Sequence, residues 1–583
     1  MSAKGEPSVL NRAAAALSAL VPFAMALVHL PSGATWEGDV ALLRGLAVSP
    51  MPGAGGVTTL LLQLAFLLPV GSLAFRAALL SAAALGLAGF FVYALAGRLL
   101  LANLRTPRLA PILAATASLS ATLAGLLQTE ATLAGGASVA LALGAMALWL
   151  LARAPGADTR TYFVVGAALG LCLVENVALG GVLLLAYGAH AALSTPRPSA
   201  KGLAVFAMGT ACAVLLPTVA PLFANDESGA RGFLAGKWLF LESQRLLPSP
   251  QLLDAGVLAW AFGLGGLLFG VAQPQIRPFA AALVVFVLAD ALLPTRPVAL
   301  SSMALVAVFV LAALGMQTGA AWLLAKPTRA NVAAVVLLVM LNVSLVAMAV
   351  ETRLFAMPSR SQQGLETVTR AALDELPPRA IVLVRSEALA RRLWAARLEE
   401  GARPDVVIVP TARLADVAFA SRLLDEEAAA VGFVRDVAMD GRPKEHSLTT
   451  LADARPLLVE FDPRWDERLV GHLVAEGPWL RFAPQPLGRS DRERAFANAL
   501  PLFERIRLAA TKDDGSLDPA TAEALTTLLR GHAASAGLLG DRDVARALLR
   551  ELADLAPNDP LVAELGHWLA SPKSAFRLQG RLP

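Results

Sequence analysis

A series of apolar runs, each long enough to cross a bilayer as a helix, constrains this 583-residue chain more than any other feature. About 20 apolar residues cross about 30 Å of hydrocarbon, and backbone groups in lipid must be hydrogen-bonded within their own segment. Each run therefore predicts a membrane-spanning helix. The runs occupy residues 13–30, 75–97, 109–128, 131–152, 202–223, 253–271, 276–294, 297–318 and 330–350.

The apolar segment 161–194 is longer than one span needs, and Glu175 and Asn176 interrupt it. Dividing it there gives two helices, so that the chain has about eleven crossings. The first run, 13–30, is followed by no clear small-residue cleavage site and by many further runs. We therefore expect it to be a retained helix and not a cleaved signal peptide.

Composition separates the chain into parts that need different solvents. Hydrophobic residues make up 56% of the chain and charged residues 16%, and the charges are concentrated after residue 350. We expect a transmembrane domain over residues 1–350, an α/β domain over 351–488 and a helical region over 489–583. The fold class is mainly α, with a small α/β unit after the membrane helices.

Several functional classes are disfavoured by composition. The net charge is only +4, with basic residues scattered over the chain, which gives no reason to expect nucleic acid as a partner. The only two cysteines, Cys172 and Cys212, lie inside apolar runs, which argues against a disulfide framework. The six histidines are scattered, so we predict neither a metal site nor a cofactor.

Basic residues beside the runs predict the orientation of the helices. With the N-terminus in the cytoplasm, alternate loops place the cations on the cytoplasmic side. These cations are Arg98, Arg105, Arg108, Arg153, Arg160, Arg197, Lys201, Arg277, Lys326 and Arg329. The opposite side receives the carboxylates Glu37, Asp39, Glu130, Glu175, Asp226, Glu227 and Asp290. Because an ionisable group near bilayer depth usually faces a cavity or a partner, this face is where we expect chemistry.

The odd number of crossings places everything after the last span outside the cytoplasm. Residues 380–384, 405–409 and 457–461 have the short apolar pattern of buried strands. From about Ser490 the pattern is helical. Residues 537–560 have the small residues and the Pro-Asn-Asp-Pro turn typical of a tetratricopeptide-type helix pair. Nearer the start, residues 56–74 predict a helix too short to span, ending before Pro69 and Gly71, at the outer membrane surface.

Two loops on the predicted outer side carry the candidate functional residues. The first, residues 32–56, holds Glu37 and Asp39 beside Trp36 and ends in a Pro/Gly cluster that cannot continue a helix. The second, residues 224–252, holds Asp226, Arg231 and Lys237, whose cations could bind a lipid phosphate or anchor the loop at the interface. Phosphate-binding loops, nucleophile elbows and zinc-protease helices are absent from the sequence.

Several motifs, taken in order, resemble the bacterial protein O-mannosyltransferase-like family of multi-pass membrane proteins, in the GT-C glycosyltransferase superfamily. Trp36-Glu-Gly-Asp39 stands where that family has an Asp-Ser-Gly-Glu loop, and Ser49-Pro-Met-Pro-Gly53 where it has a His-Pro-Pro-Gly turn. Gln128-Thr-Glu130 lies where the family has a Glu-Val-Tyr motif. The run from Gly170 to Asn176 lies where the family has a glycine-rich run ending in Asn-His. The strand-like residues 376–384 and 401–409 are similar to the start of its extracytoplasmic tail domain.

The resemblance implies a membrane glycosyltransferase of a bacterial inner membrane. Such an enzyme moves a sugar from a polyprenyl-phosphate donor to a hydroxyl of a protein or envelope glycan on the periplasmic side, where the C-terminal domain also lies. Asp39 is then the expected base, with Glu37 as the competing candidate. Glu130, Glu175, Asn176 and Asp226 would line the substrate cavity, and Arg231 or Lys237 would bind the phosphate.

Departures from the family pattern leave other functions open. Trp36 stands where the family has its leading Asp, Asp39 where it has Glu, and Asn176 where it has His. A catalytically inactive relative that acts as a membrane-anchored interaction protein is therefore the second hypothesis. A solute transporter is the third, because the sequence has one interrupted segment and no clear repeat of halves.

Overall fold

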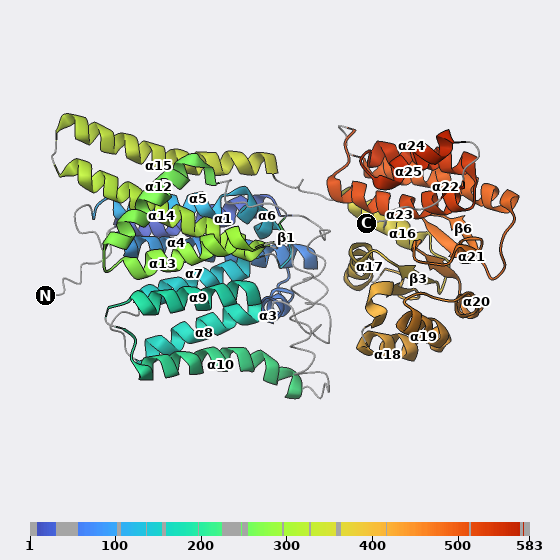
Figure 1. The fold of residues 1–583 in the computed structure, drawn as a ribbon, viewed down its shortest axis with the longest axis horizontal. Coiled ribbons are helices and arrows are strands. Elements are labelled where there is room, and N and C mark those ends of the chain that lie inside the picture. Colours follow the sequence, from blue (N-terminus) through green and yellow to red (C-terminus); the bar gives the residue numbers. More distant parts are fainter. Residues whose placement is uncertain are drawn as a thin grey trace. The chain divides into compact units, whose positions relative to one another are not determined.

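A computed structural model describes residues 9–30, 56–101, 107–135, 137–153, 159–195, 197–223, 246–247, 255–293, 296–325, 328–356, 363–400, 402–415, 417–511, 515–571 and 575–576. The chain divides near residue 360 into two compact units. We call the described residues before this point the membrane unit and those after it the sheet unit. Figure 1 shows the helices of the first and the mixed architecture of the second.

Long apolar helices, most of them side by side, build the membrane unit (Figure 1). Four are long and apolar enough to cross a membrane, α1, α4, α14 and α15 as far as Val350, and a bent pair of helices would make a fifth. The number of crossings therefore stays a prediction. The helices are α1 (Val9–Val28), α3 (Gly56–Ala65), α4 (Leu73–Leu101), α5 (Ala110–Thr122), α6 (Gly125–Thr132), α7 (Ser138–Arg153), α8 (Thr159–Glu175), α9 (Val177–Leu193), α10 (Ala200–Phe223), α12 (Gly256–Ala272), α13 (Arg277–Leu292), α14 (Val298–Leu324) and α15 (Arg329–Ala356).

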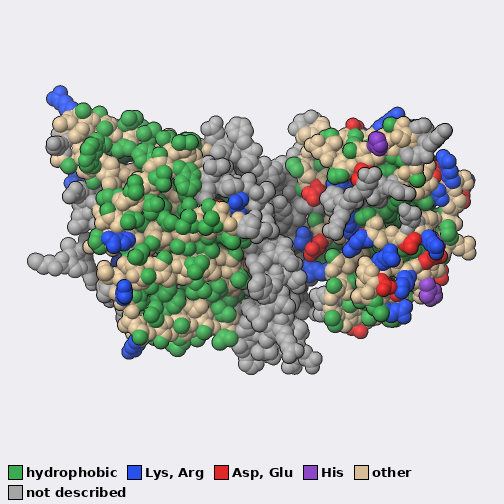
Figure 2. Space-filling model, viewed as in Figure 1, with side chains coloured by type: hydrophobic (Ala, Val, Ile, Leu, Met, Phe, Trp, Pro, Cys, Tyr) green, Lys and Arg blue, Asp and Glu red, His purple; other side chains and the backbone are tan. Residues whose placement is uncertain are grey.

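Helix α14 lies at the centre of this unit, and 94% of its most apolar 18-residue stretch is buried. It packs tightly against α12 because glycines let the two backbones approach. A Cβ atom on Gly266 would overlap the carbonyl oxygen of Leu311, and one on Gly315 would overlap that of Phe262. The visible surface of the unit is covered by hydrophobic side chains (Figure 2), as expected of a surface that faces lipid.

The predicted span 109–128 is a bent pair of helices instead of one straight helix. Helices α5 and α6 meet at an angle of 61°. Because of the bend, the Thr122 carbonyl has no backbone donor within the helix. The Gln128 side chain donates to this carbonyl at 2.9 Å and to the Pro22 carbonyl of α1 at 3.3 Å. A side chain therefore replaces the missing backbone donor inside the bundle.

A five-stranded mixed sheet forms the centre of the sheet unit, with strand order β4-β3-β5-β7-β6. The strands are β3 (Ile381–Val384), β4 (Val407–Pro410), β5 (Leu457–Val459), β6 (Leu473–Glu476) and β7 (Trp479–Phe482). Strand β3 pairs in parallel with β4 and β5, whereas β7 pairs antiparallel with β5 and β6. The three predicted strands are present, and the β6–β7 hairpin, which turns at Gly477-Pro478, is an addition that sequence reasoning missed.

Helices surround this sheet and share one hydrophobic core with it, from Leu365 to Phe576. They are α16 (Gln363–Asp374), α17 (Glu387–Glu400), α18 (Val417–Glu426), α19 (Val431–Asp440), α20 (Glu445–Ala454), α21 (Glu467–Val470), α22 (Arg489–Ala510), α23 (Pro519–Leu538), α24 (Arg542–Leu555) and α25 (Pro560–Ala570). The predicted C-terminal helical region thus packs on the sheet in the same compact unit. Its surface carries interspersed acidic and basic side chains (Figure 2).

A second, two-residue pairing lies in the membrane unit. Strand β1 (Leu246–Leu247) pairs antiparallel with β2 (Arg296–Pro297), which directly precedes α14.

Candidate functional site

Three of the eight candidate residues lie in the described part of the chain: Glu130, Glu175 and Asn176. The others, Glu37, Asp39, Asp226, Arg231 and Lys237, lie outside the described residues, as does most of the loops that hold them. The geometry of the site is therefore built from the three described residues and from the side chains that contact them.

Glu175 and Asn176 form the turn between two helices, as the sequence predicted. Helix α8 ends at Glu175 and α9 begins at Val177. The Asn176 side chain caps α9 by accepting the Leu179 N–H at 2.9 Å. The helices lie side by side (Figure 1), so close that a Cβ on Gly180 would be 2.7 Å from the Leu173 Cα. Asn is a favoured N-cap residue, which explains why the apolar segment breaks here.

The Glu175 carboxylate is buried, with 6% of the residue exposed, and both of its oxygens are bound by one residue. The Thr58 N–H donates to Oε2 at 2.9 Å, and the Thr58 hydroxyl donates to Oε1. Thr58 lies in the first turn of α3, where backbone N–H groups have no partner inside the helix. Glu175 thus caps a helix from 117 residues away in the sequence.

Arg76, near the start of α4, fixes the other end of α3. Its guanidinium donates to the carbonyl oxygens of Phe66 at 2.7 Å, Val70 at 2.9 Å and Gly71 at 3.1 Å. These carbonyls follow the last turn of α3, where Pro69 and Gly71 prevent the helix from continuing. Helix α3 is therefore held by side chains at both ends.

Glu130 lies on α6 and stabilises the turn that leads into α7. Its Oε2 accepts the Ala137 N–H at 3.0 Å. In the same turn, Ala134 shares a small hydrophobic cluster with Leu62 of α3 and Ala77 of α4. The turns that hold Glu130 and Glu175 thus both contact α3, and in Figure 1 α3 and α6 lie at one end of the bundle. We call this the carboxylate end.

Cations mark the opposite end of the same helices. Arg98, near the end of α4, donates to the Ala152 carbonyl at 2.6 Å, and the adjacent Arg153 stacks on Trp149. Ala77 and Arg98 are both on α4, 21 residues apart by their numbers, which corresponds to about 30 Å of helix. This is about the thickness of the hydrocarbon layer, so Arg98 and Arg153 lie about one membrane thickness from the carboxylate end, where Arg76 lies.

Asp290, another carboxylate of the predicted outer face, is fully buried near the end of α13. The Ser301 hydroxyl donates to it, and Arg296 donates to the Asp290 main-chain carbonyl at 2.7 Å. Sequence reasoning missed Thr58, Arg76 and Arg296 as partners. Thr58 is 117 residues from Glu175, whereas Arg76 and Arg296 each donate to a carbonyl six residues earlier in the chain. Within the described residues, no group of His, Cys, Asp and Glu side chains could hold a metal ion.

A second buried carboxylate, which sequence reasoning did not single out, lies in the sheet unit. Glu460 directly follows β5 and accepts the N–H groups of Arg385 at 2.8 Å and Ser386 at 2.7 Å, just before α17. Burial raises its pKa to about 7, against the lowering effect of these two N–H groups and the Arg385 charge. The nearby Asp462 charge raises the pKa further.

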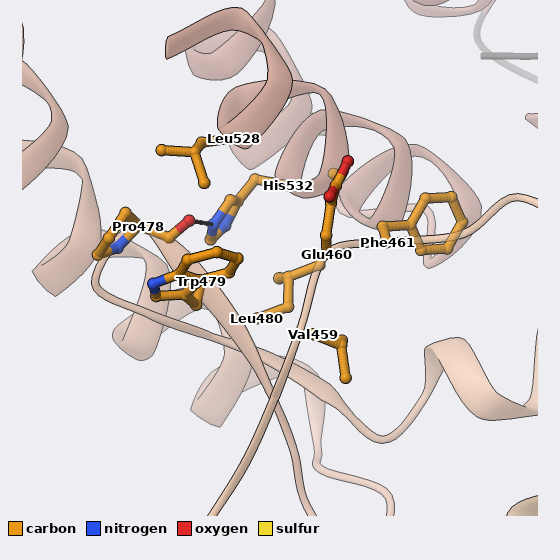
Figure 3. A pocket seen from close by; sticks show the side chains of 9 residues that line it. Val459, Glu460, Phe461, Pro478, Trp479, Leu480, Leu528 and His532 are labelled. Atoms are coloured by element: carbon orange, nitrogen blue, oxygen red, sulfur yellow. Dashed lines mark hydrogen bonds between the residues drawn. The ribbon is translucent and has the colours of Figure 1, made fainter. Parts of the chain in front are cut away.

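Glu460 lines a small cavity at the carboxyl end of β5, next to the start of β7. His532 and Trp479 line the same cavity, and His532 donates from Nε2 to the Pro478 carbonyl at 3.2 Å (Figure 3). The volume is about 10 Å³, which suits one water molecule. A sugar or nucleotide does not fit there. The candidate functional site is the carboxylate end of the membrane unit because it holds Glu130, Glu175 and Asn176.

Solved structures show which fold this arrangement belongs to. The ArnT of Cupriavidus metallidurans bound to undecaprenyl phosphate matches with 15% sequence identity and a TM-score of 0.50, over 81% of this chain and 98% of that chain. The chain therefore shares its overall fold with this ArnT. The apo state of the same ArnT matches with 15% identity and a TM-score of 0.49, again over 81% of this chain and 98% of that chain.

A tethered complex of the Archaeoglobus fulgidus oligosaccharyltransferase with an acceptor peptide gives a TM-score of 0.46 at 13% identity, over 78% of this chain and 69% of that chain. Neither the family models nor the curated proteins include a match to this sequence. The fold is thus assigned from structural similarity to ArnT alone, and membership of the O-mannosyltransferase-like family stays a prediction.

Proposed function

We propose that this protein is a membrane glycosyltransferase that takes a sugar from a polyprenyl-phosphate carrier and attaches it to a hydroxyl group. The observation that carries the proposal is the GT-C fold, shared along 98% of an ArnT structure that holds undecaprenyl phosphate. The gathering of Glu130 and Glu175 at one end of the helices also supports it. The acceptor would be a protein or an envelope glycan, and polyprenyl-phosphate mannose is the first donor to test.

The reaction needs two kinds of group. As the acceptor oxygen bonds to the sugar C1, the bond from C1 to the phosphate oxygen breaks, and the polyprenyl phosphate leaves with an added negative charge. A carboxylate must take the acceptor proton, for which we propose Asp39, with Glu37 as the competing base. A cation must stabilise the leaving phosphate, for which we propose Arg231 or Lys237.

The remaining candidates, Glu130, Glu175, Asn176 and Asp226, would shape the cavity around these groups. In the described residues, Glu175 and Asn176 bind Thr58 and the start of α9, and Glu130 binds the turn before α7. We therefore propose that these three form the wall of the site. The carboxylate end would face the periplasm of a bacterial inner membrane. The end that holds Arg98 and Arg153 would face the cytoplasm, as the positive-inside rule favours.

The test is transfer by the purified full chain in bilayers, with polyprenyl-phosphate mannose and then other polyprenyl-linked sugars as donors. The double variant Glu37→Ala/Asp39→Ala should lower kcat by about 10²–10⁴-fold, the range for loss of a general base. The double variant Asp453→Ala/Glu504→Ala, which removes two exposed carboxylates from the sheet unit, is the matched control and should transfer at the parent rate.

Transfer that survives the loss of Glu37 and Asp39 would remove the catalytic assignment. A parent protein that transfers none of the sugars would favour the other hypothesis, a catalytically inactive membrane-anchored interaction protein. Labelling of a cysteine placed at Ser228 from outside intact cells tests the orientation, because the proposal requires that loop to lie outside the cytoplasm.

A further inference from the structure

Helix α3 is held at its first turn by a carboxylate, and this contact has an unusual geometry. Glu175 accepts the N–H and the hydroxyl of Thr58 with different oxygens, so one residue binds both oxygens. Thr58 is itself buried, with 4% of the residue exposed. Only 6% of Glu175 is exposed, so its carboxylate is directed at α3 and offers little surface to a substrate.

The turn that presents Glu175 is rigid, so the contact can position α3. Asn176 caps α9 with its side chain, and Gly180 packs closely against Leu173 across the two helices. The far end of α3 is tied down separately by Arg76. The first turn of α3 is thus held by the Glu175–Thr58 contact, and the middle of the helix by the packing of Leu62.

The contacts of α3 explain why the place of this turn matters. Thr58, the third residue of α3, binds Glu175, and Leu62 of α3 packs against Ala134 in the turn that Glu130 stabilises. A shift of α3 would therefore move the wall of the proposed site. A misplacement of about 1 Å far from the chemistry is enough to lower a rate by about 10²-fold.

We infer that Glu175 is a positioning residue, which acts on the reaction through Thr58 and α3 and does not bind substrate itself. The inference rests on the proposed function, because it assigns a role in that reaction. It also makes a separate claim about α3 that needs no activity: the Thr58 amide is protected by the Glu175 carboxylate.

The experiment is a double-mutant cycle in the full chain, with Glu175→Gln, Thr58→Val and the two together. If Glu175 acts through Thr58, each single variant lowers kcat by about 10-fold or more, KM for the donor stays within about twofold, and the double variant is no slower than the slower single one. Thr58→Ser keeps the hydroxyl and should stay within about twofold of the parent. Gln63→Ala, at an exposed position of α3, is the control and should leave both constants unchanged.

Effects that multiply in the double variant, or a raised KM in Glu175→Gln alone with Thr58→Val unchanged, would overturn the inference and make Glu175 a substrate ligand. Hydrogen exchange supplies the second measurement. Glu175→Gln should speed exchange of the amides in the first turn of α3 by about tenfold, as expected for loss of a hydrogen bond to a charged group.

The two measurements separate the failures. A parent protein without transfer activity defeats the proposed function and with it a role of Glu175 in catalysis, while exchange still decides whether Glu175 holds α3. Unchanged exchange in Glu175→Gln overturns the positioning role even in an active enzyme.

Discussion

The pair formed by Glu460 and His532 predicts an unusual pH dependence of the sheet unit. Both residues line the same cavity, and burial shifts their pKa values in opposite directions, raising that of Glu460 from 4.5 to about 7 and lowering that of His532 from 6.5 to about 4. The folded state therefore holds a proton on Glu460 and none on His532 across most of the range from pH 4.5 to 6.5.

The signs of the two contributions are opposite. Because the Glu460 pKa is raised by folding, its contribution to stability is full below pH 4.5 and is lost as the pH rises through 7. Because the His532 pKa is lowered by folding, its contribution is full above pH 6.5 and is lost as the pH falls through 4. Each shift changes the free energy of unfolding by about 2–3 kcal/mol between pH 6.5 and 4.5, at about 1.4 kcal/mol per pKa unit.

The stability changes due to Glu460 and His532 nearly cancel in the parent protein between pH 6.5 and 4.5. A variant that removes one of the two titrating groups should make the other one's effect measurable. Glu460→Gln keeps an oxygen for the Arg385 and Ser386 N–H groups but cannot titrate. Its sheet unit should lose about 2–3 kcal/mol of stability on acidification from pH 6.5 to 4.5, whereas the parent changes by less than about 1 kcal/mol. His532→Gln should instead gain about 2 kcal/mol over the same range.

Hydrogen exchange of peptides from β3 and β5 in the detergent-solubilised full chain measures this, after correction for the pH dependence of intrinsic exchange. These strands form the buried centre of the sheet, so their amides report the opening of the sheet unit separately from the membrane unit. Glu504→Gln, at an exposed position of α22, is the control and should parallel the parent. Parallel curves for Glu460→Gln and the parent would refute the reasoning, since they would mean that Glu460 does not hold a proton in the folded state.

Two further predictions test the packing of each unit. Gly266→Ala should destabilise the membrane unit by about 1–3 kcal/mol, because the new Cβ would overlap the Leu311 carbonyl oxygen. Gly265→Ala is the control and should be neutral, because nothing lies within 4 Å of a Cβ at that position. Thermal unfolding in detergent compares the two variants. Trp479→Phe should destabilise the sheet unit by about 1–3 kcal/mol, because it removes the indole N–H that donates to the buried Ala372 carbonyl at 2.7 Å; exchange of β3 peptides should report the loss, and unchanged exchange would show that this carbonyl finds another donor.

Local chemistry explains which features the sequence could predict. The break after Glu175 was predictable because two polar residues interrupt an apolar run and Asn176 is a helix N-cap. The end of α3 was predictable from Pro69 and Gly71. By contrast, the bend between Thr122 and Gly125 depends on Gln128 reaching the Thr122 and Pro22 carbonyls, a tertiary contact without a local signal.

The β6–β7 hairpin does have a local signal in the sequence. Its strands are short, but Gly477-Pro478 is a turn dipeptide, and Gly477 has a φ of 58° that favours glycine. The Glu175–Thr58 contact had none, because its partners are 117 residues apart. Candidate acids could thus be located from the sequence, while the groups that bind them required the fold.

Glu175 and Glu460 together show why a buried carboxylate is an incomplete signal for a catalytic group. Both acids are buried, and both accept backbone N–H groups at the start of a helix, α3 for Glu175 and α17 for Glu460. A helix start has N–H groups without partners and a positive partial charge, so it can bind a buried acid when no substrate is present. The loss of such an acid should alter the helix that it caps. A base for the acceptor hydroxyl must instead keep an oxygen free for the proton, so Glu37→Ala/Asp39→Ala and Glu175→Gln should behave differently. Loss of the base should lower kcat by about 10²–10⁴-fold without changing hydrogen exchange in α3. Loss of the cap should change both kcat and the exchange.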